Sequence, residues 1–203
     1  MCISGFNTNR RKDSMKKTTV LMTLLMLLFS VQGFSKDFEA DTEKSEILWN
    51  AKKVTGAHNG YVSLKSGSLK FKGDKVIGGE FVVDMNSISN NDISNETMRN
   101  KLLGHLKSDD FFSVADHSES RLNITKVNTY AKNKAEVSAD LTIKGQTHPV
   151  NFTVEKVDDY YRSRISVDRS RYNVRYGSSS FFDNLGDKTI EDIFTLDVKL
   201  YLK

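Results

Sequence analysis

Two stretches of the sequence, Val137-Ser-Ala-Asp-Leu-Thr-Ile143 and Val150-Asn-Phe-Thr-Val154, alternate apolar and polar residues without a break. The run Leu196-Asp-Val-Lys-Leu-Tyr-Leu202 near the C-terminus does the same. Because successive side chains of a strand point to opposite faces of a sheet, this period of two is typical of half-buried β-strands. The turn residues Lys144-Gly145-Gln146 between the first two stretches mark the end of one strand and the start of the next.

Weaker alternation continues on both sides of this region. It occurs at Ile47/Trp49/Ala51, Val62/Leu64, Leu69/Phe71, Phe81/Val83/Met85, Leu122/Ile124 and Tyr161/Ser163/Ile165/Val167. Many antiparallel strands with one apolar face predict an all-β fold, a soluble barrel or sandwich. A closed antiparallel barrel of about eight strands would also leave no exposed edge. An outer-membrane barrel would show the same alternation, but the aromatic girdles expected of that class are missing from the sequence.

One segment departs from the period of two. Met98, Leu102 and Leu106 recur every fourth residue, and Leu103 widens the apolar stripe. With Ser94 or Asn95 as the N-cap, the spacing predicts one amphipathic helix over residues 96–107. We expect Met98, Leu102 and Leu106 to pack on the core rather than to form a moving lid.

The first 35 residues differ in character from the rest of the chain. They include Lys16 and Lys17, an apolar stretch from Val20 to Phe29, and the small residues Gly33 and Ser35, an order typical of a secretory signal with cleavage after Ser35. The apolar stretch is shorter than the roughly 20 residues that span a bilayer, so we expect no integral membrane segment after cleavage. The predicted organisation is an N-terminal extension and signal peptide, residues 1–35, followed by one domain, residues 36–203, in the periplasm or outside the cell.

Removing this leader changes the charge balance. The chain has 30 Lys and Arg against 26 Asp and Glu, and the whole excess of positive charge belongs to residues 1–35. A neutral domain lacks the field that attracts nucleic acid, so we expect no nucleic-acid partner. The chain's one cysteine, Cys2, also precedes the domain, which therefore has no disulfide, thiolate metal site or cysteine nucleophile.

The sequence offers no recognisable catalytic or metal-binding pattern. The four histidines, His58, His105, His117 and His148, lack metal-site spacing, and Ser178-Ser-Ser180 lacks the residues of a nucleophile elbow. We expect no enzyme activity, no catalytic residue, no metal and no cofactor. His105 and Asp109, one helical turn apart, could form a charge-assisted hydrogen bond at the helix end.

Six segments, taken in order, resemble a known family. They are Ser45-Glu-Ile-Leu-Trp49, Lys53-Val-Thr-Gly-Ala-His-Asn-Gly60, Gly78-Gly-Glu-Phe-Val-Val-Asp-Met-Asn-Ser-Ile88, His105-Leu-Lys-Ser-Asp-Asp-Phe-Phe112, Asp140-Leu-Thr-Ile-Lys-Gly145 and Asp168-Arg-Ser-Arg-Tyr-Asn-Val174. Over residues 37–203 the chain resembles the YceI-like family of lipocalin-like, lipid-binding proteins. The resemblance implies an exported barrel of about eight strands whose apolar cavity holds a polyisoprenoid or another long amphiphile. The segment Asp116-His-Ser-Glu-Ser-Arg121 is more polar than the family pattern.

For such a ligand, each CH₂ moved from water into an apolar site contributes about 0.8 kcal/mol, and no catalytic group is needed. Phe111 and Phe112 follow the helix; one closes the cavity while the other packs under the helix, or both belong to the core. Arg169 either meets an anionic ligand group or, as the favoured alternative, lies on a solvated strand face or forms an ion pair with Asp84 or Asp168. The predicted ligand-binding residues are Trp49, Phe71, Phe81, Val83, Leu102, Leu106, Phe111, Phe112, Leu141, Ile143, Phe152, Ile165, Arg169 and Leu196.

Two functional hypotheses follow. In the first, the domain sequesters or transports a lipid in its cavity. In the second, its own side chains fill the barrel, as in many small barrels, and it acts through its surface as an interaction module or a stress-response protein. The alternation alone favours the filled barrel and the resemblance favours the cavity. The identity of the lipid and the oligomeric state are left open.

Overall fold

The computed structural model describes Met1 and residues 35–131 and 133–203. The predicted leader lies outside the described residues except for Met1 and Ser35, so its cleavage after Ser35 stays a prediction. One compact unit spans Ser35–Lys203. As predicted, this unit is built from antiparallel strands and a single α-helix within the described part of the chain.

The ten strands form one sheet in the order β1-β4-β5-β6-β7-β8-β9-β10-β2-β3. Their bounds are β1 Ser35–Glu39, β2 Glu46–Lys53, β3 Gly56–Tyr61, β4 Ser63–Lys72, β5 Lys75–Asp84, β6 Glu119–Ala131, β7 Lys134–Ile143, β8 Gln146–Val157, β9 Tyr160–Asp168 and β10 Ile193–Tyr201. The helix α2 spans Glu96–Lys107 and lies between β5 and β6 in the chain. From β4 to β10 every strand pairs with the next strand in sequence, so this part is a simple meander.

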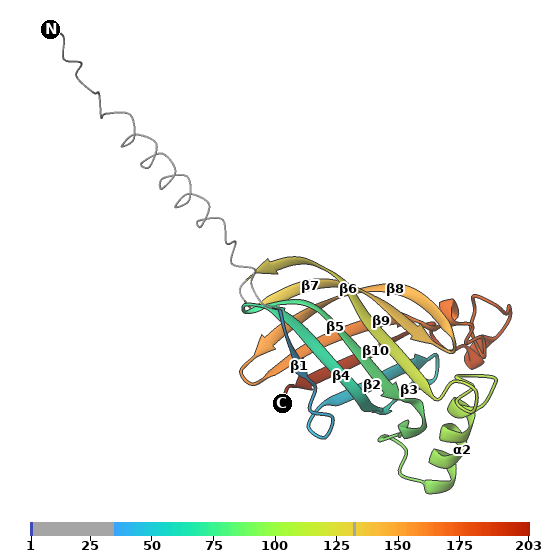
Figure 1. Ribbon diagram of the computed structural model, residues 1–203. Coiled ribbons are helices and arrows are strands. Elements are labelled where there is room, and N and C mark those ends of the chain that lie inside the picture. The colour runs from blue at the N-terminus through green and yellow to red at the C-terminus, as the bar shows by residue number, and fades with distance from the viewer. Residues whose placement is uncertain (2–34, 132) are drawn as a thin grey trace. The chain divides into compact units, whose positions relative to one another are not determined.

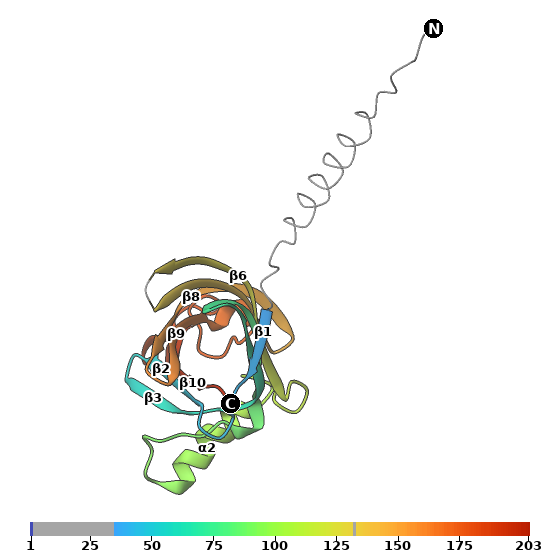
Figure 2. The same ribbon diagram turned by 60° about the vertical axis from the view of Figure 1, so that its left-hand side comes forward.

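The sequence predicted about eight strands, and the structure has ten because two long strands of the barrel are interrupted. Only Val62 separates β3 from β4, and a short loop separates β1 from β2. β1 pairs with β4, and β2 pairs with β3. β1 and β2 together therefore form one strand position of the wall, and β3 and β4 together form the next. β10 then pairs with β2, and Leu202 bridges Ala40 just beyond β1. The sheet therefore curls round until its two sides meet (Figure 2). With β1 and β2 counted as one position and β3 and β4 as another, the wall has eight strand positions.

The inward face of the strands is the apolar face that the alternation predicted. Along β7, Val137, Ala139, Leu141 and Ile143 are each at most 5% exposed. The turn that follows has positive φ at Lys144 (49°) and Gly145 (72°), the backbone of a tight two-residue hairpin that glycine adopts without strain. The hairpin fixes the register that keeps these side chains inside.

Helix α2 begins and ends where the sequence predicted, and the N-cap is Asn95, whose side chain accepts a hydrogen bond from the backbone N–H of Met98 (3.0 Å). The predicted packing stripe is wrong in part. Met98 is 60% exposed, and the residues that pack on the core are Leu103 and Leu106. Positions spaced by four drift about 40° per step around a helix, so Met98 is turned about 80° from Leu106 and points away from the barrel.

The two ends of the barrel are covered differently. Figure 1 shows α2 and the connection between β9 and β10 at one end, which we call the helix end. At the other end, the Phe71 ring packs between the rings of Phe38 (5.3 Å between centroids) and Tyr161 (6.0 Å). These three aromatic rings pack together near the turn between β4 and β5.

Candidate functional site

An apolar cavity of about 190 Å³ lies inside the barrel, and carbon atoms form nearly all of its surface. Its wall consists of the inward-facing residues of strands all round the barrel, because a strand presents every second side chain to the same face. The apolar strand residues that line it are Ile47, Trp49 and Ala51 from β2; Leu64 and Leu69 from β4; Phe81 and Val83 from β5; Leu122 and Ile124 from β6; Leu141 and Ile143 from β7; Phe152 and Val154 from β8; Tyr161 and Ile165 from β9; and Phe194, Leu196, Val198 and Leu200 from β10.

All but two of the predicted binding residues line this cavity. Those in the strand wall are Trp49, Phe81, Val83, Leu141, Ile143, Phe152, Ile165 and Leu196, and those at the helix end are Leu106, Phe111, Phe112 and Arg169. That these residues contact a ligand stays a prediction.

Phe71 and Leu102 are outside the lining. Phe71 is buried, but it lies beyond Leu69 on β4 and packs against Phe38 and Tyr161. Leu102 is half-buried on α2, but the residues of this helix that pack against the core are Leu103 and Leu106.

Several lining residues were not predicted, and they divide into two kinds. Ile47, Leu69 and Leu200 belong to the same alternating runs as the predicted residues, so extending the inward face along each strand identifies them. Ile88 and Ile190 come from loops at the helix end, where no periodicity marks which side chains face inward.

The polar segment before Leu122 does not open the wall. Ser120 is 7% exposed, and its hydroxyl donates a hydrogen bond to the sulfur of Met85 (3.1 Å). Leu122 pairs with Phe81 on β5, and both line the cavity. Elsewhere in this polar segment, Glu119 forms ion pairs with Lys65 and Arg121.

Phe111 and Phe112 both line the cavity; Phe111 belongs to the buried core and Phe112 packs against it, which agrees with the alternative that both belong to the core. Their rings are 5.0 Å apart and nearly perpendicular (78°), an edge-to-face pair that covers the helix end of the cavity. The backbone N–H of Phe111 donates to the carbonyl of Ser108, the C-cap of α2. The tight turn after the helix thus aims both rings into the barrel.

Trp49 is held in a fixed orientation in the wall. Its indole N–H donates to the carbonyl oxygen of Ser89 (3.0 Å), in the loop that leads to α2. This loop crosses directly over Gly60 on β3, where an added Cβ would lie 1.9 Å from the same carbonyl oxygen. Glycine at position 60 is therefore required for the loop to reach Trp49. The chain has one tryptophan, so its fluorescence reports on the cavity alone.

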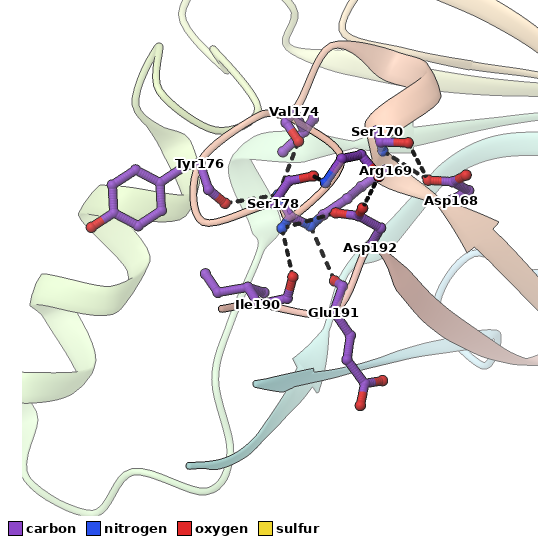
Figure 3. A network of polar contacts seen from close by, with 10 residues as sticks. Asp168, Arg169, Ser170, Val174, Tyr176, Ser178, Ile190, Glu191 and Asp192 are labelled. Atoms are coloured by element: carbon purple, nitrogen blue, oxygen red, sulfur yellow. Dashed lines mark hydrogen bonds and ion pairs between the residues drawn. The ribbon is translucent and has the colours of Figure 1, made fainter. Parts of the chain in front are cut away.

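Arg169 contributes only its side-chain stem to the cavity, because protein acceptors take its N–H groups. Figure 3 shows the guanidinium surrounded by backbone carbonyls from the β9–β10 connection. It donates to the carbonyls of Val174 (2.9 Å), Tyr176 (2.9 Å), Ile190 (3.0 Å) and Glu191 (3.1 Å). The residue is 2% exposed, and burial lowers the pKa of its guanidinium from the ordinary value.

The acidic partner of Arg169 is neither of those expected. Asp192 forms the ion pair, with Oδ1 3.2 Å from Nη2. Asp168, which the sequence favoured together with Asp84, accepts hydrogen bonds from the backbone N–H (3.0 Å) and the hydroxyl (2.6 Å) of Ser170 and caps the turn after β9. Arg169 is a structural anchor for the β9–β10 connection.

The predicted hydrogen bond between His105 and Asp109 is wrong. Asp109 accepts from the hydroxyl of Ser113 (3.1 Å), while the His105 ring lies against the rings of Tyr176 (4.3 Å between centroids) and Phe111 (5.6 Å). Among the described residues, no group of three or more His, Cys, Asp or Glu side chains is placed to hold a metal ion. In the same part of the chain, no helix is long and apolar enough to cross a membrane.

A meander barrel around an apolar cavity, with a helix across one end, defines a lipocalin-like protein. The model of the YceI-like domain matches residues 38–202, and the chain belongs to this family. Two solved structures have the same fold: Burkholderia cenocepacia BcnA (TM-score 0.60, 19% identity, 79% of this chain and 98% of that one) and a polyisoprenoid binding domain from Saccharophagus degradans (TM-score 0.59, 16% identity, 82% and 97%).

Curated relatives are UPF0312 proteins from Vibrio species. The one from Vibrio campbellii is 33% identical over 129 residues, which are 60% of this chain and 63% of the relative, so the match covers less than two thirds of that protein. One from Vibrio cholerae is 28% identical over 148 residues, 70% of this chain and 74% of the relative.

Proposed function

We propose that this protein binds the hydrocarbon chain of a lipid, a polyisoprenoid or a comparable long amphiphile, inside its barrel and carries or sequesters it in an aqueous compartment. The observation that carries the proposal is the cavity itself, whose wall is almost purely carbon. The similarity in fold to a polyisoprenoid binding domain supports it. Burial of each CH₂ group stabilises the complex by about 0.8 kcal/mol.

The size of the cavity limits how such a ligand fits. Its volume of about 190 Å³ exceeds the roughly 150 Å³ of an apolar protein cavity that takes up benzene, but it is below the roughly 300 Å³ at which pockets for larger ligands begin. The cavity admits one end of a hydrocarbon chain as it stands. A longer chain requires the side chains at the helix end, Leu106, Phe111 and Phe112, to move.

Binding rather than catalysis fits the chemistry of the wall. Arg169 is the charged residue buried at the cavity, and its N–H groups are already bonded to protein acceptors. We further propose that the protein is exported to the periplasm or the medium, with cleavage after Ser35. N-terminal sequencing of the protein recovered from a periplasmic fraction tests this, and an intact leader there contradicts it.

The decisive test is organic extraction of the purified protein followed by mass spectrometry, together with titration of geranylgeraniol followed by Trp49 fluorescence. We expect a long-chain compound in the extract and a saturable change of the fluorescence. No compound, and no change on incubation with lipid, would favour the second hypothesis, a barrel that acts through its surface.

A matched pair of variants locates the binding site. Val83→Phe adds a ring inside the cavity, whereas Val82→Phe adds one on the opposite face of the same strand, because adjacent strand residues point to opposite faces. We expect Val83→Phe to weaken geranylgeraniol binding at least about tenfold and Val82→Phe to leave it unchanged. Equal effects of the two variants would place the ligand outside the barrel.

A further inference from the structure

The β9–β10 connection presents apolar side chains to solvent at the helix end. Tyr176, Phe181 and Phe182 are 50%, 40% and 50% exposed, and Val54, at the tip of the β2–β3 hairpin, is 64% exposed. The two segments are neighbours, since the backbone N–H of Val54 donates to the carbonyl of Thr189 (3.2 Å). We call Val54, Tyr176, Phe181 and Phe182 the aromatic rim. Soluble proteins rarely gather exposed aromatic side chains in one place without a partner.

The connection that carries the aromatic rim is held in place from within. Ser178 is fully buried, and its carbonyl accepts from the backbone N–H groups of both Phe181 (3.2 Å) and Phe182 (3.1 Å). The hydroxyl of Ser180 donates to Asp192 (2.6 Å), the partner of Arg169, and Arg169 binds the carbonyl of Tyr176 (Figure 3). The fold therefore fixes these rings outward.

The aromatic rim adjoins the cavity. Ile190 lines the cavity, its backbone N–H donates to the carbonyl of Gly177 (2.8 Å) beside Tyr176, and it bridges Lys53 beside Val54. A hydrocarbon chain that entered at the helix end would pass next to these exposed side chains. The surface at this point is thus continuous with the proposed lipid site.

The charges around the aromatic rim favour an interface with anionic headgroups. The exposed basic residues Lys52, Lys53, Arg175 and Lys188 outnumber the exposed acidic residues Asp183, Asp187 and Glu191. The Arg175 guanidinium lies over the Phe181 ring, 4.9 Å from its centroid. Aromatic rings beside Lys and Arg are the composition of protein surfaces that lie in the headgroup region of a bilayer.

We propose that the aromatic rim docks on the surface of a lipid bilayer that contains anionic headgroups, and that the barrel takes up or releases its lipid there. The purpose of this docking rests on the proposed function, but the docking itself can be measured without any ligand in the cavity. Most of the binding energy comes from insertion of Phe181 and Phe182, and the small excess of basic residues adds attraction to the headgroups.

The test is flotation of the protein with vesicles of phosphatidylcholine and phosphatidylglycerol in equal parts. The double variant Phe181→Ser/Phe182→Ser should lower the vesicle partition coefficient about tenfold or more. The matched control is Ile77→Ser, since Ile77 is 45% exposed on β5 and lies far from the aromatic rim in the chain. Circular dichroism must show the native spectrum in both variants, as expected for exposed positions.

The outcomes separate the docking surface from the lipid site. Loss of flotation in the double variant, with geranylgeraniol still changing Trp49 fluorescence, supports the proposal. The proposal is overturned if the wild-type protein does not float with the vesicles, or if the double variant floats as well as the control. The remaining explanation of the exposed aromatic side chains would then be a protein partner. If wild-type protein floats but no geranylgeraniol binds, docking stands and the proposed function fails.

Discussion

Arg169 carries a positive charge into the protein interior, where backbone carbonyl groups and the carboxylate of Asp192 surround it. Four backbone carbonyls accept its N–H groups, and Asp192 completes the shell. A planar guanidinium can bond in several directions at once, which a lysine ammonium on the same stem cannot reproduce. One side chain therefore determines the path of the whole β9–β10 connection.

Replacing this side chain should destabilise the protein strongly. Arg169→Met leaves four buried carbonyls and the carboxylate of Asp192 without their donor, so we expect the free energy of unfolding to fall by about 3–5 kcal/mol. Urea denaturation followed by circular dichroism measures the change. The control is Arg171→Met, at an exposed neighbouring position, which should alter stability by less than about 0.5 kcal/mol. Similar losses in both variants would contradict an anchoring role.

Asp92 fixes the loop that leads from β5 to α2. Its carboxylate accepts from the backbone N–H of Asn59 (2.9 Å), the side chain of Asn90 (2.6 Å) and the ring of His58 (2.7 Å). Burial acts to raise the pKa of this carboxyl group, but the three hydrogen bonds outweigh burial, so its pKa lies below the ordinary value. This loop also carries the carbonyl of Ser89 that binds Trp49.

The lowered pKa of Asp92 predicts a dependence of stability on pH. Because the folded state favours the ionised form, the stabilisation is complete above the ordinary pKa of about 3.8 and is lost as the pH falls through the lower folded-state value. Asp92→Asn should therefore be less stable than the wild type at pH 7 and lose less stability on acidification. Urea denaturation at several pH values tests this, with Asp159→Asn, in an exposed turn, as the control.

At the scale of elements, α2 is the least anchored part of the barrel. None of its residues is buried, and its contacts with the core come from Leu103, Leu106 and the ring of His105, whereas every strand of the wall is hydrogen-bonded to its neighbours. Elements with few buried contacts open at lower free energy than the rest of a fold. Since Leu106 lines the cavity, opening of α2 uncovers the helix end.

Weakening the N-cap of α2 should therefore speed lipid exchange. Asn95→Ala removes the side chain that accepts from the N–H of Met98, at a cost of about 1 kcal/mol to the helix. We expect faster amide hydrogen exchange within α2 and about fivefold faster dissociation of geranylgeraniol, with β7 unaffected. Asn100→Ala, at an exposed position inside the helix, should slow exchange slightly, since alanine favours helix. Unchanged dissociation in Asn95→Ala, despite faster amide exchange, would show that α2 does not control access.

At the scale of the whole molecule, the sequence predicted those parts of the structure that a regular alternation of apolar and polar residues marks. The period of two in runs such as Val137–Ile143 specifies both the strand and its inward face, so the wall of the cavity was largely predictable. Ile88 and Ile190 line the cavity because of the conformation of their loops, which the alternation does not predict. The partners of Arg169 are mostly backbone carbonyls, and every residue type has a backbone carbonyl, so the sequence does not indicate them. The breaks between β1 and β2 and between β3 and β4 depend on how the sheet closes. Closure brings together residues that are far apart in the sequence, such as Ala40 and Leu202, so a local pattern does not predict it.

Because strands from the whole length of the domain form the cavity wall, a ligand there should stabilise the whole barrel rather than one element. A lipid that binds only the folded state adds about 2.7 kcal/mol at a free concentration one hundred times its Kd. We expect geranylgeraniol to raise the Tm of the wild type and of Val82→Phe by several degrees, and to raise the Tm of Val83→Phe by about half as much or less, since a tenfold higher Kd halves the stabilisation at this concentration. Differential scanning calorimetry measures both shifts. If Val83→Phe were stabilised as much as Val82→Phe, the lipid would be bound on the surface, with the aromatic rim as the first place to look.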